Sequence, residues 1–164
     1  MSKNSIAIVG LGNLLLGDEG FGVHLIRHLK EHFSFENVDI IDGGTIGFQL
    51  IEYFLEYDKL IIVDAIKTDD EAGSIYKFSL EELPPNITFV SSIHEIGLGD
   101  VLQQVKFMGE ETEVTVVGIA PLSVCPNELT TELSNFMKQK IEPVANIIIE
   151  EVKKIGGKVC TKAQ

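Results

Sequence analysis

Runs of consecutive apolar residues alternate along the chain with segments whose apolar residues recur every three or four positions. The runs are typical of strands buried on both faces of a sheet, and the periodic segments are typical of amphipathic helices. We predict strands over residues 5–9, 38–41, 60–63, 74–78, 88–90 and 113–119, the one over 74–78 at an edge of the sheet. We predict helices over 19–31, 48–54 and 99–108, and a long final helix from residue 130 to about residue 155.

The periodicity also predicts which helical residues face the core. In the first helix these are Leu25, Ile26, Leu29 and Phe33; in the last they are Leu133, Met137, Ile141, Val144, Ile148, Val152 and Ile155. Thr130 is expected to cap the final helix, Pro143 to kink it, and Gly156-Gly157 to end it. Leu83-Pro84-Pro85 interrupts the chain before the strand over 88–90.

This alternation predicts an α/β fold, a single-domain three-layer α/β/α sandwich with a mostly parallel twisted sheet, over residues 1–164. In such folds, ligands bind in the crevice at the carboxyl ends of the strands. Catalytic and ligand-binding side chains are therefore expected among the residues that follow each predicted strand.

The first predicted strand leads into a Gly-rich loop whose chemistry is the reverse of a phosphate-binding loop. Gly12 and Gly17 have the Walker spacing, but Asp18-Glu19 follow where a P-loop carries Lys-Ser/Thr. Two like charges 4 Å apart repel by roughly 4 kcal/mol at an effective dielectric near 20, so these carboxylates repel a nucleotide and attract a cation. Gly17 also comes too late after Gly12 for a dinucleotide fingerprint. The alternative is structural: Asp18 caps the helix and Glu19 complements its dipole.

Composition narrows the possible partners. A net charge of −12 argues against a nucleic-acid-binding surface, which needs clusters of Lys and Arg. No apolar run reaches the roughly 18 residues of a membrane-spanning helix, and the N-terminus lacks the features of a signal peptide. The two cysteines, Cys125 and Cys160, are far apart in the sequence. We expect both to be reduced thiols in a cytoplasmic protein that binds neither nucleic acid nor membrane.

Four polar side chains follow different predicted strands: Glu19, Asp42, Asp64 and His94. Two or three carboxylates and one imidazole at the same edge of a sheet suit a borderline divalent metal such as nickel or zinc. Each residue also has an ordinary structural alternative, since Asp64 can cap a helix and His94 can be a core histidine. A rival metal site consists of His24, His28 and His32, spaced four residues apart along one face of the first helix. Its alternative is a polar shoulder on an amphipathic helix.

The same residues resemble a known family, the nickel-iron hydrogenase maturation proteases. The resemblance runs from residue 6 to about residue 155 and rests on four blocks in order. They are Gly10-x-Gly12-Asn13-x-Leu15-x-x-Asp18-Glu19-Gly20-x-Gly22, Asp42-Gly43-Gly44-Thr45, Val63-Asp64-Ala65 and Ser92-x-His94-Glu95. The resemblance implies an endopeptidase that removes the C-terminal extension of the nickel-loaded large-subunit precursor of a nickel-iron hydrogenase.

The resemblance also implies roles for individual residues. Glu19, Asp64 and His94 match the catalytic, metal-contacting acids and histidine, and Asp42, Gly43 and Gly44 match the substrate-recognition box. The nickel is implied to arrive with the precursor, so we expect the free enzyme to be metal-free. We also expect it to be a monomer. The metal can activate the peptide or water, or Glu19 or Asp64 can act as a general base; the sequence leaves both open. The alternative function is a non-catalytic nickel-sensing or nickel-chaperone module.

Overall fold

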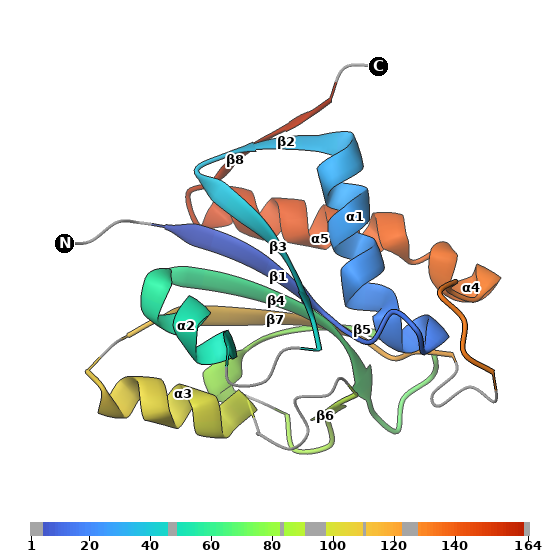
Figure 1. Ribbon diagram of the computed structural model, residues 1–164, viewed down its shortest axis with the longest axis horizontal. Coiled ribbons are helices and arrows are strands. Elements are labelled where there is room, and N and C mark those ends of the chain that lie inside the picture. Colours follow the sequence, from blue (N-terminus) through green and yellow to red (C-terminus); the bar gives the residue numbers. More distant parts are fainter. Residues whose placement is uncertain are drawn as a thin grey trace.

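A twisted, mostly parallel sheet forms the centre of the fold, between two layers of helices (Figure 1). The computed structural model describes residues 5–45, 49–82, 84–90, 98–109, 111–122 and 128–162. Within these ranges the strand order is β3-β1-β4-β7-β5, with β6 paired to β4. The strands are β1 (Ile6–Leu11), β3 (Val38–Gly44), β4 (Lys59–Lys67), β5 (Ile75–Ser79), β6 (Thr88–Phe89) and β7 (Glu113–Ile119).

The central strands follow directly from the apolar runs. β1 is buried throughout and β4 is buried from Leu60 to Ile66, because helices cover both faces of these strands. β3, β1, β4 and β7 run parallel, whereas β5 pairs antiparallel with β7 at the edge predicted for residues 74–78. β6 runs antiparallel to the end of β4, a direction that the sequence did not predict.

Helices cover both faces of the sheet, which confirms the predicted three-layer sandwich. α1 (Phe21–His32) and α5 (Ile141–Lys154) pack on one face, while α2 (Gln49–Glu56) and α3 (Leu98–Phe107) pack on the other (Figure 1). Alternate residues of β1 divide between these layers: Ile8 faces α1 and α5, and Val9 faces α2 and α3. Phe48, the predicted first residue of α2, lies outside the described residues, as does Leu83 of the predicted break.

The predicted final helix is divided in two, α4 (Asn135–Lys138) and α5. Ser134 caps α4, since its Oγ accepts a hydrogen bond from the Met137 N–H at 3.3 Å; the predicted cap, Thr130, lies further upstream. Pro143 lies in the first turn of α5, where its missing N–H costs no helical hydrogen bond, and the break precedes it. The predicted core stripe is confirmed, and Gly156-Gly157 follow the end of α5 as predicted.

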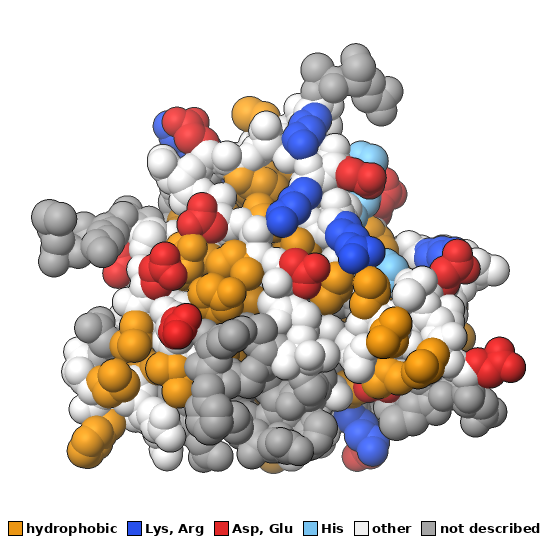
Figure 2. Space-filling view, viewed as in Figure 1, with side chains coloured by type: hydrophobic (Ala, Val, Ile, Leu, Met, Phe, Trp, Pro, Cys, Tyr) orange, Lys and Arg blue, Asp and Glu red, His pale blue; other side chains and the backbone are white. Residues whose placement is uncertain are grey.

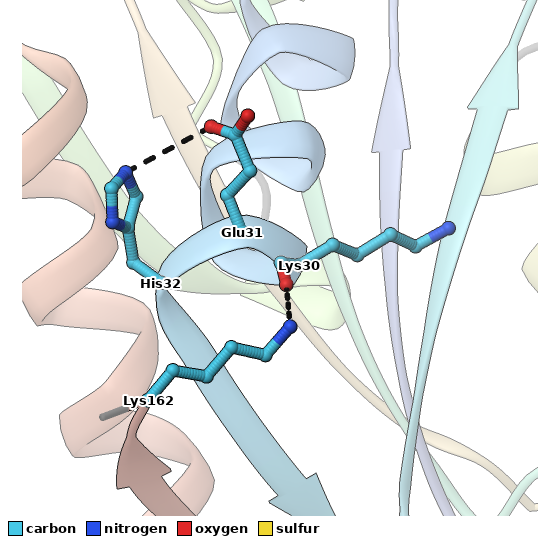
Figure 3. Close-up of polar contacts among 4 residues, drawn as sticks. All are labelled: Lys30, Glu31, His32 and Lys162. Atoms are coloured by element: carbon cyan, nitrogen blue, oxygen red, sulfur yellow. Dashed lines mark hydrogen bonds and ion pairs between the residues drawn. The ribbon is translucent and has the colours of Figure 1, made fainter. Parts of the chain in front are cut away.

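A two-stranded antiparallel ribbon, β2 (Phe33–Glu36) with β8 (Lys158–Thr161), was not predicted from the sequence. Phe33 begins β2 instead of continuing α1, although it still packs against the core. Lys162 ties the ribbon to the end of α1: its N–H donates to the His32 carbonyl at 2.9 Å, and its Nζ reaches the Lys30 carbonyl (Figure 3). A cation is favourable there because carbonyl oxygens concentrate at a helix C-terminus.

Two further observations concern the helices and the cysteines of the described residues. Among the helices of the described ranges, none is both long and apolar enough to cross a membrane. Cys160 is a free, exposed thiol in β8, and Cys125 lies outside the described residues.

Candidate active site

The Gly-rich loop joins β1 to α1 through a buried 3-10 turn, Gly17–Gly20. Asp18 and Glu19 lie in this turn and are only 3% and 5% exposed. α1 begins after the turn, at Phe21, and not at Glu19 as predicted. Gly20 occupies the N-cap position of α1, and no side chain caps that helix. The structural alternative, in which Asp18 caps this helix, is therefore wrong.

Close backbone packing sets the position of the turn. A Cβ on Gly22 would lie 2.2 Å from the Leu11 carbonyl oxygen and 2.5 Å from that of Val63, so the first turn of α1 rests directly on β1 and β4. A Cβ on Gly12 would similarly lie 2.3 Å from the Glu19 carbonyl oxygen. These glycines let Glu19 sit beside the carboxyl ends of β1 and β4, because any side chain would separate the backbones.

Asp64 lies within β4, which continues for three more residues to Lys67, so the prediction that the strand ends at Asp64 is wrong. The pairing of β1 with β4 stops at Gly10 and Val63, one residue before Asp64. Asp64 is fully buried, and its strand contacts the turn that carries Glu19. Two buried carboxylates therefore belong to adjoining elements at the same edge of the sheet, as the sequence predicted.

His94, the third predicted metal-contacting residue, lies outside the described residues. The described chain leading to it ends at Val90, whose N–H donates to the Ala65 carbonyl at 3.1 Å, next to Asp64. Within the described ranges there is no group of three His, Cys, Asp or Glu side chains able to hold a metal ion. A three-ligand site at Glu19 and Asp64 therefore needs a residue from beyond those ranges.

Asp42, Gly43 and Gly44 continue β3, which therefore extends beyond the strand predicted over residues 38–41. The register with β1 shifts here, since Asp42 pairs with Gly10 and Gly44 with Leu11. Asp42 is exposed, and its Oδ1 accepts a hydrogen bond from the Gly44 N–H at 3.1 Å. The Gly44 carbonyl accepts one from the Gly12 N–H at 2.9 Å. This bulge therefore borders the Gly-rich loop, at the same edge as Glu19.

Two of the three histidines of α1, His24 and His28, line one side of a cavity of about 640 Å³ between α1 and the 131–142 segment. Its lining mixes acidic and basic groups, and Figure 2 shows histidines among side chains of both charges. His32 is exposed, with its Nε2 3.9 Å from the Glu31 carboxylate (Figure 3). His24 is half-buried, and its Nε2 has no hydrogen-bond partner among the described residues. The polar-shoulder interpretation therefore holds for His32 but not for His24, and the three do not form a metal site.

Acid is expected to destabilise the fold through these histidines. Burial, reinforced by the positive charge of Arg27, lowers the pKa of His24, and burial with nearby His32 lowers the pKa of His28. The folded chain therefore favours neutral imidazoles, and the unfolded chain takes up more protons as the pH falls through 6.5. Their contribution to stability is present above that pH and lost below it. The urea midpoint should fall between about pH 7.5 and 5.5, and less steeply in His24→Gln.

The matched control is Lys30→Gln, which changes an exposed side chain of the same helix that does not contribute to the pKa shift of His24 or His28. It should retain the wild-type dependence of the urea midpoint on pH. If His24→Gln shows the same slope as Lys30→Gln, the acid sensitivity arises elsewhere.

The fold and the site define a class of protein: an α/β sandwich with buried carboxylates where its parallel strands end, the usual place for a ligand site in such sheets. The family model described as hydrogenase maturation protease matches residues 23–151. The chain belongs to this family, as the sequence resemblance implied.

Individual relatives agree with the family model. The hydrogenase 2 maturation protease of Escherichia coli K12 is 34% identical over 154 residues, covering 92% of each chain. The hydrogenase expression/formation protein HupD of Rhizobium leguminosarum is 36% identical over 148 residues, covering 87% of this chain and 73% of its own. The structure of the hydrogenase maturating endopeptidase HybD from E. coli matches with a TM-score of 0.82 and 29% identity, covering 96% of this chain and 98% of its own. These relatives support an enzyme, an endopeptidase of hydrogenase maturation, over the non-catalytic alternative.

Proposed function

We propose that this endopeptidase removes the C-terminal extension of a nickel-loaded hydrogenase large-subunit precursor, using Glu19, Asp64 and His94 at the carboxyl edge of its sheet. The observation that carries the proposal is the placement of two buried carboxylates on adjoining elements at that edge. Burying a charged carboxylate is costly unless a cation or hydrogen-bond donors compensate it. We infer that Glu19 and Asp64 together bind a cation that the substrate delivers.

His94 can reach this site by chain length alone. Val90 is hydrogen-bonded beside Asp64, and His94 is four positions further along the chain. A fully extended chain covers about 3.3–3.6 Å per residue, so four positions span at most about 14 Å. This distance is compatible with an imidazole that joins the two carboxylates.

The proposed ligand set suits recognition of nickel already held by the precursor. Two carboxylates and one imidazole leave coordination positions open, unlike the four protein ligands of a closed structural site. Nickel is then part of the substrate, and only a precursor that already holds nickel binds in the position needed for cleavage. Glu19 or Asp64 can take a proton from the attacking water as a general base, and the ion can polarise the scissile carbonyl.

The test is to incubate the purified protein with the large-subunit precursor, with and without nickel, and to measure the precursor mass. We expect the precursor to lose its C-terminal extension only when nickel is loaded. A chelator that does not strip the precursor should leave the reaction intact. Equal cleavage of the nickel-free precursor would contradict nickel-dependent recognition, and no cleavage of either form would contradict the proposed activity.

Asp42 is expected to serve precursor recognition and not chemistry. Its exposed carboxylate lies on the bulge that borders the Gly-rich loop, where a docked precursor would meet it. Asp42→Asn can keep the Oδ1 acceptor for the Gly44 N–H, so the bulge should persist while the charge is lost. We expect KM for the precursor to rise severalfold with kcat nearly unchanged. A loss of kcat with unchanged KM would instead assign Asp42 to the catalytic groups.

A further inference from the structure

Asp18 is joined to a residue far away in the sequence. Its Oδ1 accepts a hydrogen bond from the Ser134 N–H at 2.7 Å, and its Oδ2 accepts one from the Ser134 Oγ–H at 3.0 Å. Ser134 Oγ in turn accepts from the Met137 N–H, which caps α4. The carboxylate is 3% exposed, so both bonds form largely out of water, where bonds to a charged group are strong.

A second connection holds the same loop next to this one. Leu16 and Thr130 form a parallel bridge, in which the Gly17 N–H donates to the Thr130 carbonyl and the Thr130 N–H donates to the Leu15 carbonyl, each at 2.9 Å. The 130–134 segment is therefore hydrogen-bonded to both ends of residues 15–18 of the Gly-rich loop, through Thr130 at one end and Ser134 at the other. Glu19 is the next residue along the chain.

The 130–134 segment is itself anchored in the hydrophobic core. Leu133 directly precedes Ser134, and Met137 follows it three residues later in α4; both are buried in the cluster that contains Phe21 and Leu25 of α1. The turn with Asp18 and Glu19 is thus held between α1 and the start of α4. An acid at position 18 makes this possible because a carboxylate can accept from the N–H and the hydroxyl of one serine simultaneously.

We infer that Asp18 is a positioning residue: its carboxylate clamps the 3-10 turn to Ser134 and thereby holds Glu19 in place for the reaction. The inference rests on the proposed role of Glu19. The Asp18 carboxylate accepts the two hydrogen bonds from Ser134 that form the clamp, and Glu19 supplies the carboxylate that faces the substrate's metal. The two adjacent acids therefore have different tasks.

The experiment compares Asp18→Ala, Asp18→Asn and Ser134→Ala in the processing of nickel-loaded precursor, with kcat expressed per folded molecule. Displacing a catalytic group by about 1 Å can cost about 100-fold, so Asp18→Ala should lower kcat by about 10- to 100-fold with KM little changed. Asp18→Asn should recover most of this loss, because an amide can accept from the Ser134 N–H and donate to its Oγ. Ser134→Ala should give a smaller loss, because the N–H bond remains, and adding it to Asp18→Ala should cause no further loss.

The outcomes separate this inference from its alternatives. If Asp18 bound the metal, Asp18→Asn would be as inactive as Asp18→Ala. If the clamp served stability alone, Asp18→Ala would lower the melting temperature but keep wild-type kcat; either result overturns the inference. Should Asp18→Ala fail to fold, wild-type kcat in Ser134→Ala would overturn it, with the exposed Ser34→Ala as the matched control. A fully active Glu19→Gln would instead contradict the proposed function.

Discussion

Glu19→Gln and Asp64→Asn are each expected to reduce precursor cleavage by at least about a hundredfold, the smaller end of what a general acid or base contributes. Each change replaces a carboxylate by a neutral amide of similar shape, so packing is retained while the negative charge is lost. An amide cannot accept a proton from water, and it is a poor partner for a divalent cation. Single-turnover cleavage of nickel-loaded precursor, followed by mass spectrometry, measures the loss.

Stability provides the necessary control for these two variants. Both carboxylates are buried, and each amide keeps the size and shape of the side chain that it replaces, so the melting temperatures should stay near the wild-type value. Glu31→Gln is the matched control, since it makes the same chemical change at an exposed position of α1 and should cleave normally. If both site variants fold and cleave at the wild-type rate, this edge of the sheet is not the active site.

The fold was predictable because its central strands are buried on both faces. β7 was predicted with its observed bounds, and the central apolar run of β4 was found, since no surface-facing residues interrupt such strands. The β2–β8 ribbon was missed for the opposite reason. Each of its strands has four residues that alternate between half-buried and exposed, apart from the exposed pair at the end of β8. Such short strands are defined by their pairing across a large sequence separation, which periodicity does not report.

The site was predictable in part. The rule that ligands bind where parallel strands end located Glu19, Asp42 and Asp64 at one edge of the sheet. The local backbone structure around these residues was harder to predict from the sequence: Asp64 lies inside its strand, and Asp42–Gly44 form a bulge. These details depend on where the neighbouring strand stops pairing. Likewise, the Asp18–Ser134 contact spans 116 positions, and only capping by Asp18 within its own helix was foreseeable.

Gly22→Ala is expected to be among the most destabilising single substitutions in the chain. In an unobstructed helix, Gly→Ala stabilises by up to about 1 kcal/mol, because alanine has the higher helix propensity. Here the new methyl group would lie 2.2 Å and 2.5 Å from two backbone carbonyl oxygens, of Leu11 and Val63, which belong to central strands and cannot rotate away. The helix must move instead. Overpacking of this kind costs about 1–3 kcal/mol or occasionally more, and we expect a loss at the upper end of that range.

Movement of α1 would also carry the 3-10 turn away from β4, so the surviving folded fraction of Gly22→Ala should have a lower kcat on nickel-loaded precursor. Urea unfolding gives the stability change, and cleavage per folded molecule gives the catalytic one. Gly109→Ala is the control: a Cβ there meets nothing within 4 Å, and only its φ of +87° opposes alanine. It should cost about 1–2 kcal/mol, the usual penalty of a left-handed residue, and leave kcat unchanged. A Gly22→Ala variant as stable and active as the wild type would show that the helix does not need close backbone packing to hold Glu19.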